Sequence, residues 1–413
     1  MRVSLISPKQ QSDVDLASIL DERFFLQSCL PPFDSRAVDF LATLSTAVLG
    51  KSGIEAYPEI VALAHWLRRA HLESMISEFR RTVHERHVVA PRGLAFHVAP
   101  SNVDSIFLYS WSLSLIAGNS NVVRLSQRSN DQLDILLEEL RRVFQSSDWN
   151  DLAARNIFMT YEHESEINAY LSARSDIRIL WGGNETIRLL RAFPAKPTTL
   201  DIALADKFSY ALVDAASYLS MTEREHQEMA KRFFNDAYWF DQMACSSPRL
   251  VYFVGQDDVC HKASEAFWRC NNEELRRRNH VDSVGIAMNK LVFVTEKAAR
   301  GVVLTAPNGE SKPLNSVVTI EPNSVDQCRD TCGGGFFFQS FVRSLDQVRL
   351  AAREDDQTVS YVGFSKPDLE SYARSLHGRG PVRIVPFGQA LTFGPTWDGF
   401  ELFNELTKRI YLE

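Results

Sequence analysis

The chain has 413 residues, of which 45% are hydrophobic and 23% are charged. These proportions are typical of a soluble globular protein and argue against a disordered or fibrous chain. Such a length predicts about two to three structural units, with a core large enough to need no disulfide bonds. The net charge of −7 argues against nucleic acid or an anionic membrane surface as a partner, because both attract clustered lysine and arginine.

The cysteines and histidines predict neither a disulfide scaffold nor a metal site. Six cysteines in this chain are too sparse for a scaffold. Cys328 and Cys332 are not followed by a second Cys or His pair at zinc-finger spacing. His84 and His87 lie one helical turn apart with no third ligand evident, which is typical of a solvated helix face. We therefore expect reduced cysteines and no metal.

Two further features predict a cytoplasmic protein without a membrane span. Residues 2–15 carry only a few apolar side chains before polar ones, unlike the apolar core of a signal peptide. The longest uncharged run, 105–123, is interrupted at 118–121, and what remains suits a buried helix better than a membrane span.

The first ninety residues predict helices that only contribute packing. Asp34 precedes apolar residues at helical spacing and is expected to cap the first of these helices. A second apolar pattern, free of glycine, predicts one helix from Pro58 to the arginines at 80–81. We assign no chemistry to either.

From Arg92 the pattern alternates between strands and helices. We expect strands at 93–102, 121–126, 156–161 and 177–183, with helices at 105–117, at 130–144 and from Asn184. Connections this short between strands and helices indicate parallel βαβ units, and therefore a doubly wound sheet.

A second mixed region follows Asp214. We expect helices at 222–240, 261–279 and 345–353, and strands at 249–254, 291–295, 315–320, 359–364 and 383–388. The sequence thus predicts an α/β protein with an N-terminal helical and dinucleotide-binding domain (1–213) and a catalytic domain (214–385). A C-terminal segment (386–413) is expected to return to the first domain or to form an oligomer interface.

Cys245, in the segment DQMACSSPR (241–249), is the thiol best placed for chemistry. It follows an amphipathic helix and precedes an apolar strand. Backbone N–H groups at such a junction can favour the thiolate. A buried structural cysteine is the alternative, and the local sequence leaves both interpretations open.

Polar residues follow two neighbouring strands of the first domain. Asn102 ends the strand 93–102, and Arg124 and Ser126 end the strand 121–126. Ligands of open α/β sheets gather beyond the carboxyl ends of strands, where an amide can donate to an oxyanion and a cation can bind a ribose or phosphate. A turn-forming asparagine and a solvated arginine are the alternatives.

The segment WGGNET (181–186) forms a glycine-containing turn between a strand and a helix. Gly182, Gly183 and Asn184 could bring backbone N–H groups and a helix N-terminus to a phosphate. The segment is not a G-x-G-x-x-G fingerprint, and the chain contains no P-loop motif.

These segments occur in an order that resembles the LuxC-type acyl-CoA reductases, the fatty-acid reductases of bacterial bioluminescence, which belong to the aldehyde dehydrogenase fold superfamily. The resemblance covers about residues 90–413. Its most specific segments are DQMACSSP and the C-terminal WDGFELFNELTKRI. It implies an aldehyde-dehydrogenase-like α/β fold, with a Rossmann-type cofactor domain and an α/β catalytic domain.

The resemblance also implies roles for individual residues. Cys245 falls on the nucleophile of the family, and Asn102 on the oxyanion-hole asparagine of a Pro-x-Asn motif. Arg124 replaces the usual lysine that touches the adenosine ribose. The cofactor-binding residues implied in this way are Pro100, Ser101, Arg124, Ser126, Gly182, Gly183 and Asn184. Arg124, with Arg128 close by, favours NADPH over NADH.

Two positions depart from the superfamily pattern. Ala203 stands where a glutamate usually activates hydrolytic water, and Phe336 stands where a carboxylate usually holds the nicotinamide ribose. The loss of the first carboxylate favours reduction of a thioester over oxidation of an aldehyde, because a general base would hydrolyse an acyl-enzyme.

The expected function is therefore NADPH-dependent reduction of a long-chain acyl-CoA, or of an acyl group on a carrier protein or an acyl-protein synthetase, to the aldehyde. We also expect a homo-oligomer. An oxidative aldehyde dehydrogenase and a non-catalytic subunit that binds an acyl group or a partner protein remain as alternatives.

Overall fold

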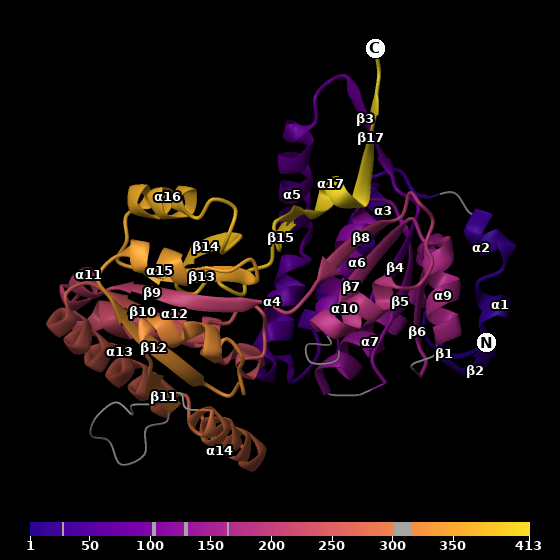
Figure 1. Cartoon of the computed structure of the whole chain (residues 1–413). Coiled ribbons are helices and arrows are strands. Elements are labelled where there is room, and N and C mark those ends of the chain that lie inside the picture. Colours follow the sequence, from indigo (N-terminus) through magenta and orange to yellow (C-terminus); the bar gives the residue numbers. More distant parts are fainter. Residues whose placement is uncertain (27–28, 101–104, 128–130, 163–164, 301–315) are drawn as a thin grey trace. The chain divides into compact units, whose positions relative to one another are not determined.

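The computed structural model describes the chain except residues 27–28, 101–104, 128–130, 163–164 and 301–315. It divides into two compact units (Figure 1). The first comprises Met1–Asp206 and Phe393–Glu413, and the second comprises Lys207–Thr392. The expected division after residue 213 differs from this one by the strand Phe208–Asp214, which is hydrogen-bonded within the sheet of the second unit.

The first unit is built on a sheet of seven strands in the order β2-β1-β6-β5-β4-β7-β8. Its five parallel strands follow the order 3-2-1-4-5 along the chain, which is the order of a Rossmann-type sheet. The strands are β1 (Arg2–Ser7), β2 (Gln11–Asp15), β4 (Leu94–Val98), β5 (Ser120–Arg124), β6 (Asn156–Thr160), β7 (Ile177–Trp181) and β8 (Leu200–Leu204).

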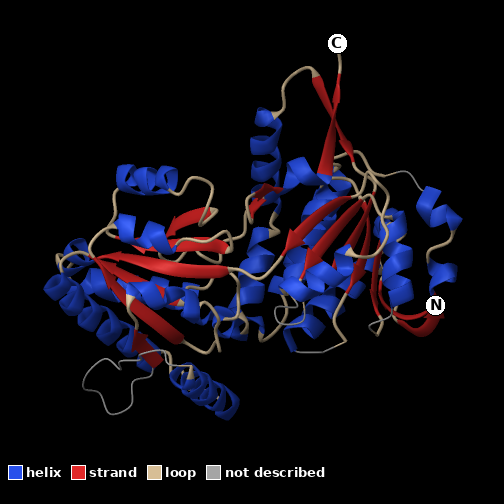
Figure 2. Ribbon diagram, in the orientation of Figure 1, coloured by secondary structure: helices blue, strands red, loops and turns tan. Residues whose placement is uncertain are grey.

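Helices flank this sheet (Figure 2). Every side chain of α6 (Ile106–Ile116) is buried, as the long uncharged run predicts. The α-helices of this unit are α1 (Leu16–Ile19), α2 (Glu22–Leu26), α3 (Ser35–Leu49), α4 (Pro58–Trp66), α5 (Arg69–Thr82), α6, α7 (Asp131–Phe144), α8 (Asn150–Ala153), α9 (Ser165–Arg174), α10 (Asn184–Arg191) and α17 (Leu402–Leu406).

The N-terminal helices agree with the sequence in one case and differ from it in another. The Asp34 side chain accepts a hydrogen bond from the backbone N–H of Arg36 and caps α3, as expected. The single helix expected from 58 to 81 is wrong. Arg68 is extended, with ψ near 140°, so the chain turns between α4 and α5. Each of the two helices then packs its own apolar face.

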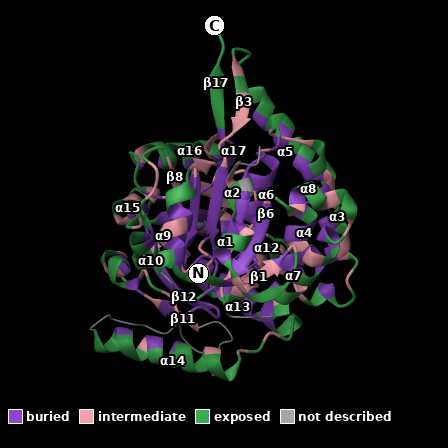
Figure 3. Ribbon diagram, turned by 90° about the vertical axis from the view of Figure 1, so that its right-hand side faces the viewer, coloured by how far each residue is buried: buried purple, intermediate pink, exposed green. Residues whose placement is uncertain are grey.

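The C-terminal residues return to the first unit. Strand β17 (Thr407–Tyr411) pairs antiparallel with β3 (His87–Pro91) in a two-stranded ribbon. The outer residues of β17 are exposed (Figure 3). A second short ribbon joins β15 (Thr396–Trp397) to β16 (Phe400–Glu401).

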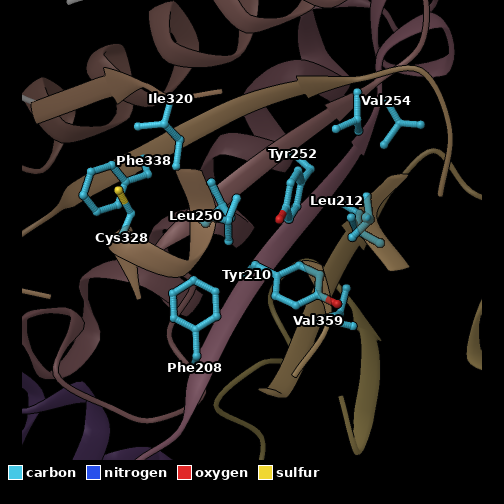
Figure 4. Close-up of a cluster of buried hydrophobic side chains, with 14 of the residues drawn as sticks. Phe208, Tyr210, Leu212, Leu250, Tyr252, Val254, Ile320, Cys328, Phe338 and Val359 are labelled. Carbon is cyan, nitrogen blue, oxygen red and sulfur yellow. The ribbon is translucent and has the colours of Figure 1, made fainter. Parts of the chain in front are cut away.

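The second unit contains a sheet of six parallel strands in the order β11-β12-β10-β9-β13-β14. The strands are β9 (Phe208–Asp214), β10 (Leu250–Val254), β11 (Ser316–Thr319), β12 (Phe336–Val342), β13 (Asp356–Val362) and β14 (Arg383–Pro386). Alternate residues of β9 and β10 point to one face and form a buried cluster with Ile320, Phe338 and Val359 (Figure 4).

Helices cover both faces of this sheet. One face packs against α11 (Ala215–Leu219), α12 (Glu223–Tyr238) and α13 (Asp257–Arg277). The other packs against α14 (Val284–Ala299), α15 (Leu345–Ala351) and α16 (Lys366–Ser375). Since both faces are covered, the strands consist of nearly continuous buried residues.

The strand expected at 291–295 is wrong, because these residues lie within α14. Ser283 caps this helix through the backbone N–H of Ile286. Lys290, Phe293 and Lys297 form its buried stripe at helical spacing. Tertiary packing and the cap therefore override the strand preference of the apolar run. In the described part of the chain, no helix combines the length and apolarity that a membrane crossing needs.

A buried carboxylate fastens the end of the second unit to α12. Asp236 is 1% exposed and accepts hydrogen bonds from the backbone N–H groups of Gly388 (2.7 Å) and Ala390 (2.8 Å). Burial raises the pKa of Asp236 to about 7. Because the pKa is higher in the folded state, its contribution to stability is greatest when the group is protonated and is lost as pH rises from about 4 to about 7.

We therefore expect Asp236→Asn to remove this part of the pH dependence of stability. The free energy of unfolding of the parent should fall relative to that of the variant between pH 4.5 and 7.5, by up to ~4 kcal/mol. Denaturant titrations at both pH values measure the difference. Asp258→Asn, at an exposed position on α13, is the control. An equal pH slope in parent and Asp236→Asn would contradict the assignment.

Candidate active site

Cys245 lies in a tight turn that precedes β10. The segment Trp239–Gln242 follows α12 as an irregular, mostly left-handed turn. The backbone N–H of Ser247 then donates to the carbonyl of Ala244 at 3.1 Å. This hydrogen bond closes a turn with Cys245 at its second position. The thiol is free of disulfide bonding and half-buried.

A single buried amide anchors this loop to the start of β12. The side-chain N–H groups of Gln242 donate to the carbonyls of Pro248 (2.9 Å) and Phe336 (2.8 Å). Its oxygen accepts from the backbone N–H groups of Gly335 and Phe336, each at 3.0 Å. Gln242 thus uses both donors and both acceptor sites. Gly335 allows the approach, because a Cβ there would lie 2.4 Å from the Tyr238 ring and its φ is +77°.

The backbone just before the nucleophile candidate is strained. Phe240, Asp241 and Gln242 all have left-handed conformations, with φ of 55°, 51° and 62°. Each such residue costs about 1–3 kcal/mol and persists only where its surroundings hold it. The hydrogen bonds of Gln242, together with the donation from the Gly334 N–H to the Asp241 carbonyl at 2.7 Å, supply that restraint. Strain of this kind concentrates at functional sites.

Two polar side chains contact Cys245 from neighbouring strands. The Ser209 hydroxyl, at the start of β9, donates to the Cys245 carbonyl at 2.7 Å and accepts from the Thr358 N–H at 3.2 Å. The Gln357 amide, at the start of β13, donates to Sγ of Cys245 at 3.2 Å. A hydrogen bond to sulfur favours the thiolate over the thiol.

The sequence did not predict Gln242, Gln357 or Ser209 as site residues. Gln242 lies inside the segment quoted for Cys245, so its proximity is its only local signal. Gln357 and Ser209 are far from Cys245 in the chain, and a polar residue at the start of a strand carries no specific pattern. Only strand order brings them to the same edge of the sheet.

The residues expected to bind the cofactor follow adjacent strands in the first unit. Val98, at the end of β4, pairs with Arg124 of β5 and with Leu180 of β7. The N–H of Ala99 donates to the Arg124 carbonyl at 3.0 Å. The strand order reverses between β4 and β7, so Pro100 and Gly182 follow the two strands that flank the topological switch point, where such sheets bind ligands.

Arg124 and Ser126 are half-buried at this edge. The Arg124 guanidinium lies over the ring of the buried Tyr161, 5.1 Å from its centroid. This cation–π contact orients the guanidinium. Ser101, Asn102 and Arg128 lie outside the described residues.

The turn at 182–184 opens α10 as expected, with Gly183 as the residue before the first turn. The backbone N–H of Asn184 donates to the carboxylate of Asp206 at 2.9 Å. One of the amides expected to face a phosphate therefore has a carboxylate partner. Asp206 follows β8 directly, and its contact with this helix could not be inferred from sequence spacing.

The two departures from the superfamily pattern lie in strands. Ala203 is half-buried in β8, and Phe336 is 2% exposed in β12, where its ring packs on Phe293 at 5.2 Å. Residue 336 thus belongs to the hydrophobic core of the second unit.

The fold is that of the aldehyde dehydrogenases. A benzaldehyde dehydrogenase from Corynebacterium glutamicum, described as NAD-dependent, is 14% identical with a TM-score of 0.64, over 100% of this chain and 94% of its own. A 1-pyrroline-5-carboxylate dehydrogenase from Thermus, solved with bound NAD, is 13% identical with a TM-score of 0.65, over 99% of this chain and 89% of its own. A lactaldehyde dehydrogenase is 12% identical with a TM-score of 0.65, over 96% and 89%.

Residues 61–284, which are more than half of the chain, match the acyl-CoA reductase (LuxC) family. The chain therefore belongs to this family, and the resemblance found in the sequence is confirmed. Its class of chemistry is oxidoreduction of acyl groups and aldehydes. No curated protein matches the chain at a significant level of sequence similarity.

The hydrogen bond from Gln357 gives a prediction about the Cys245 thiol. Gln357→Leu removes a donor to sulfur, so the thiolate loses a stabilising partner and we expect alkylation at neutral pH to slow by about 2–5-fold. The rate of alkylation by iodoacetamide at Cys245, followed by mass spectrometry across pH, measures this change. Gln227→Leu, at an exposed position on α12, is the control. An alkylation profile that matches the parent would show that the contact does not affect the thiol.

Proposed function

We propose that this protein reduces an acyl thioester to the corresponding aldehyde with NADPH, through an acyl-enzyme on Cys245. The observation that carries the proposal is the position of this thiol: half-buried in a restrained turn, with the Gln357 amide donating to its sulfur. Membership of the acyl-CoA reductase family supports the class of substrate.

The first half of the proposed reaction transfers the acyl group to the protein. The Cys245 thiolate attacks the thioester carbonyl, and the bond between that carbon and the sulfur of the donor breaks. The departing thiolate takes a proton, and the acyl group remains on Sγ of Cys245. The Gln357 donor favours the charged form of the attacking group, and the restrained loop limits its motion.

The second half releases the aldehyde. A bound reduced nicotinamide dinucleotide supplies the hydride for this step. Cys245 holds the carbonyl carbon that is reduced, and collapse of the resulting thiohemiacetal returns the thiolate and releases the aldehyde. A Rossmann-type strand order, with Arg124 at the end of β5 and the Gly182–Gly183 turn after β7, on either side of β4, fits a dinucleotide at that edge of the first unit.

Two further residues carry roles by resemblance. The Asn102 amide would stabilise the oxyanion formed on Cys245, together with the Cys245 backbone N–H. Ala203 offers no carboxylate to activate water, so an acyl-enzyme would persist until it is reduced. This difference favours the reductive direction over the oxidative one.

The proposal also includes the acyl donor, the cellular compartment and the assembly state. The acyl donor would be a long-chain acyl-CoA, or an acyl group carried by a carrier protein or an acyl-protein synthetase. The protein would act in the cytoplasm as a homo-oligomer, and the exposed ribbon of β3 and β17 is the surface we assign to that assembly.

The proposal is tested by intact mass spectrometry after mixing the protein with long-chain acyl-CoA. We expect one acyl adduct per chain, located on Cys245, and its discharge as aldehyde when NADPH is added. Cys245→Ala should form no adduct. Asn102→Ala should form it about 10²–10³ times more slowly while remaining folded.

Other outcomes would favour the alternatives. Formation of free acid from aldehyde and NADP⁺, faster than reduction of acyl-CoA, would indicate an oxidative dehydrogenase. A Cys245→Ala variant that matches the parent in every assay, with no adduct across chain lengths or donors, would indicate a non-catalytic binding subunit.

Arg124 gives a separate prediction about the cofactor. If its guanidinium binds the 2′-phosphate, Arg124→Gln should lower kcat/KM for NADPH by ~10–100-fold, the cost of one charge-assisted contact. The value for NADH should change about 2-fold or less. Steady-state kinetics with both cofactors measure this difference. Arg188→Gln, at an exposed ion pair on α10, is the control, and equal losses with both cofactors would contradict the assignment.

A further inference from the structure

The helices α12 and α13, which pack on each other in the second unit, carry four potential metal ligands. Glu223 and His226 are three residues apart on α12, and Cys270 and Glu273 are three residues apart on α13. Residues at this spacing share one helix face. The two helices pack closely through Phe233 and Phe267, whose ring centroids are 5.0 Å apart.

Three of the ligand atoms are close enough for a single ion. One carboxylate oxygen of Glu223, Sγ of Cys270 and one carboxylate oxygen of Glu273 all lie within 4.8 Å of one another. Zinc binds sulfur, nitrogen and oxygen at ~2.0–2.3 Å, which places any two ligands at most about 4.6 Å apart. Small rotations of these three side chains would bring their ligand atoms to one ion, and His226 would join them from the side of Glu223.

His226 provides an independent observation that points to a cation. Its Nε2 lies 2.8 Å from the Tyr218 carbonyl, so this nitrogen carries the proton and Nδ1 keeps its lone pair in the neutral ring. Nδ1 is buried, has no hydrogen-bond partner among the described residues, and lies 3.9 Å from a carboxylate oxygen of Glu223. That distance is too long for a hydrogen bond.

The histidine ring is held in this orientation. The Tyr218 ring stacks on it, with centroids 4.5 Å apart and an interplanar angle of 24°. A histidine that ligates a metal commonly donates its other N–H to a backbone carbonyl, which sets the tautomer. The contact of His226 with the Tyr218 carbonyl is of this kind.

Arg269 now neutralises the two carboxylates. Its Nη1 lies 3.2 Å from Glu223 and 3.2 Å from Glu273. The guanidinium holds both carboxylates near Cys270, but it does not reach the lone pair of His226 by any hydrogen bond that the structure records. It therefore preorganises the carboxylates and competes with a cation for them.

We infer that Glu223, His226, Cys270 and Glu273 form a site for a divalent cation of zinc type. A nitrogen, a sulfur and two carboxylate oxygens match the ligands of Zn²⁺, whereas calcium and magnesium prefer oxygen alone. Binding replaces the thiol proton of Cys270, which is released to solvent, and displaces Arg269 from the carboxylates. This inference departs from the expectation of no metal that was drawn from the sequence.

An entry path exists on the surface. A hollow of about 510 Å³ lies over the groove between α12 and α13, and its lining includes Cys270 and Glu273. The hollow gives solvent access to the Cys270 and Glu273 side of the site, and Arg224, Lys231 and Arg277 also line it. A bound ion would join α12 to α13 and would therefore stabilise the packing of the two helices. The site takes no part in the chemistry proposed for Cys245.

The test uses the full chain after dialysis against a chelator, with Co²⁺ as a spectroscopic probe and Zn²⁺ as a competitor. We expect one Co²⁺ per chain with the absorption of a cobalt–thiolate bond, and its displacement by Zn²⁺. Cys270→Ser should abolish this absorption, whereas Cys332→Ser, at a half-buried thiol elsewhere, should keep it.

Surface carboxylates give a second comparison that does not depend on a core substitution. Glu273→Gln should weaken Zn²⁺ binding by at least ~10-fold. Glu370→Gln, which removes an ion-paired carboxylate from α16, should leave it unchanged. Arg269→Gln should strengthen binding, because it removes the competing cation.

Three results would overturn the inference: absence of Co²⁺ binding, a thiolate absorption that survives Cys270→Ser, or equal affinities of Glu273→Gln and Glu370→Gln. Each is distinct from a failure of the acyl transfer proposed for Cys245. The absorption and the affinity are measured without substrate or cofactor.

Discussion

The geometry around Cys245 depends on the buried amide of Gln242. Its four hydrogen bonds join the loop before β10 to the backbone at Gly335 and Phe336. Without them, buried backbone groups would lose their partners, at about 1–3 kcal/mol each. The left-handed residues that precede the thiol would also lose their main restraint. A single neutral side chain thus maintains a strained conformation next to the residue assigned to covalent chemistry.

The two units place their candidate residues at different edges of their sheets. In the first unit, Pro100, Arg124 and Gly182 lie at the carboxyl ends of strands, which is where open α/β sheets bind dinucleotides. In the second unit, Cys245 precedes β10 and is contacted from the starts of β9 and β13. The amino edge of a parallel sheet offers no general ligand site. Here side chains of neighbouring strands bind the Cys245 carbonyl and sulfur, and our proposed site depends on these contacts.

Fold and family define the general chemistry, and individual residues decide the reaction. The aldehyde dehydrogenase fold accommodates both oxidation and reduction, so it does not set the direction by itself. The absence of a carboxylate at Ala203 bears on that direction because water activation requires a base. The network between α12 and α13 is separate from this chemistry. In the site we propose there, the ion pairs of Arg269 hold Glu223 and Glu273 near Cys270. The same guanidinium would compete with a metal cation for these carboxylates.

The sequence by itself determined the α/β class, the cap at Asp34, most strands of the two sheets and the family, because these depend on local periodicity and on motifs contiguous in the chain. It did not reveal the break at Arg68 or the helix at 291–295, where packing and capping outweigh local preference. Only the tertiary structure brought Gln357 and Ser209 to Cys245, Asp206 to α10, and Glu223 to Cys270. Such contacts depend on strand order and helix packing, and no spacing along the chain encodes them.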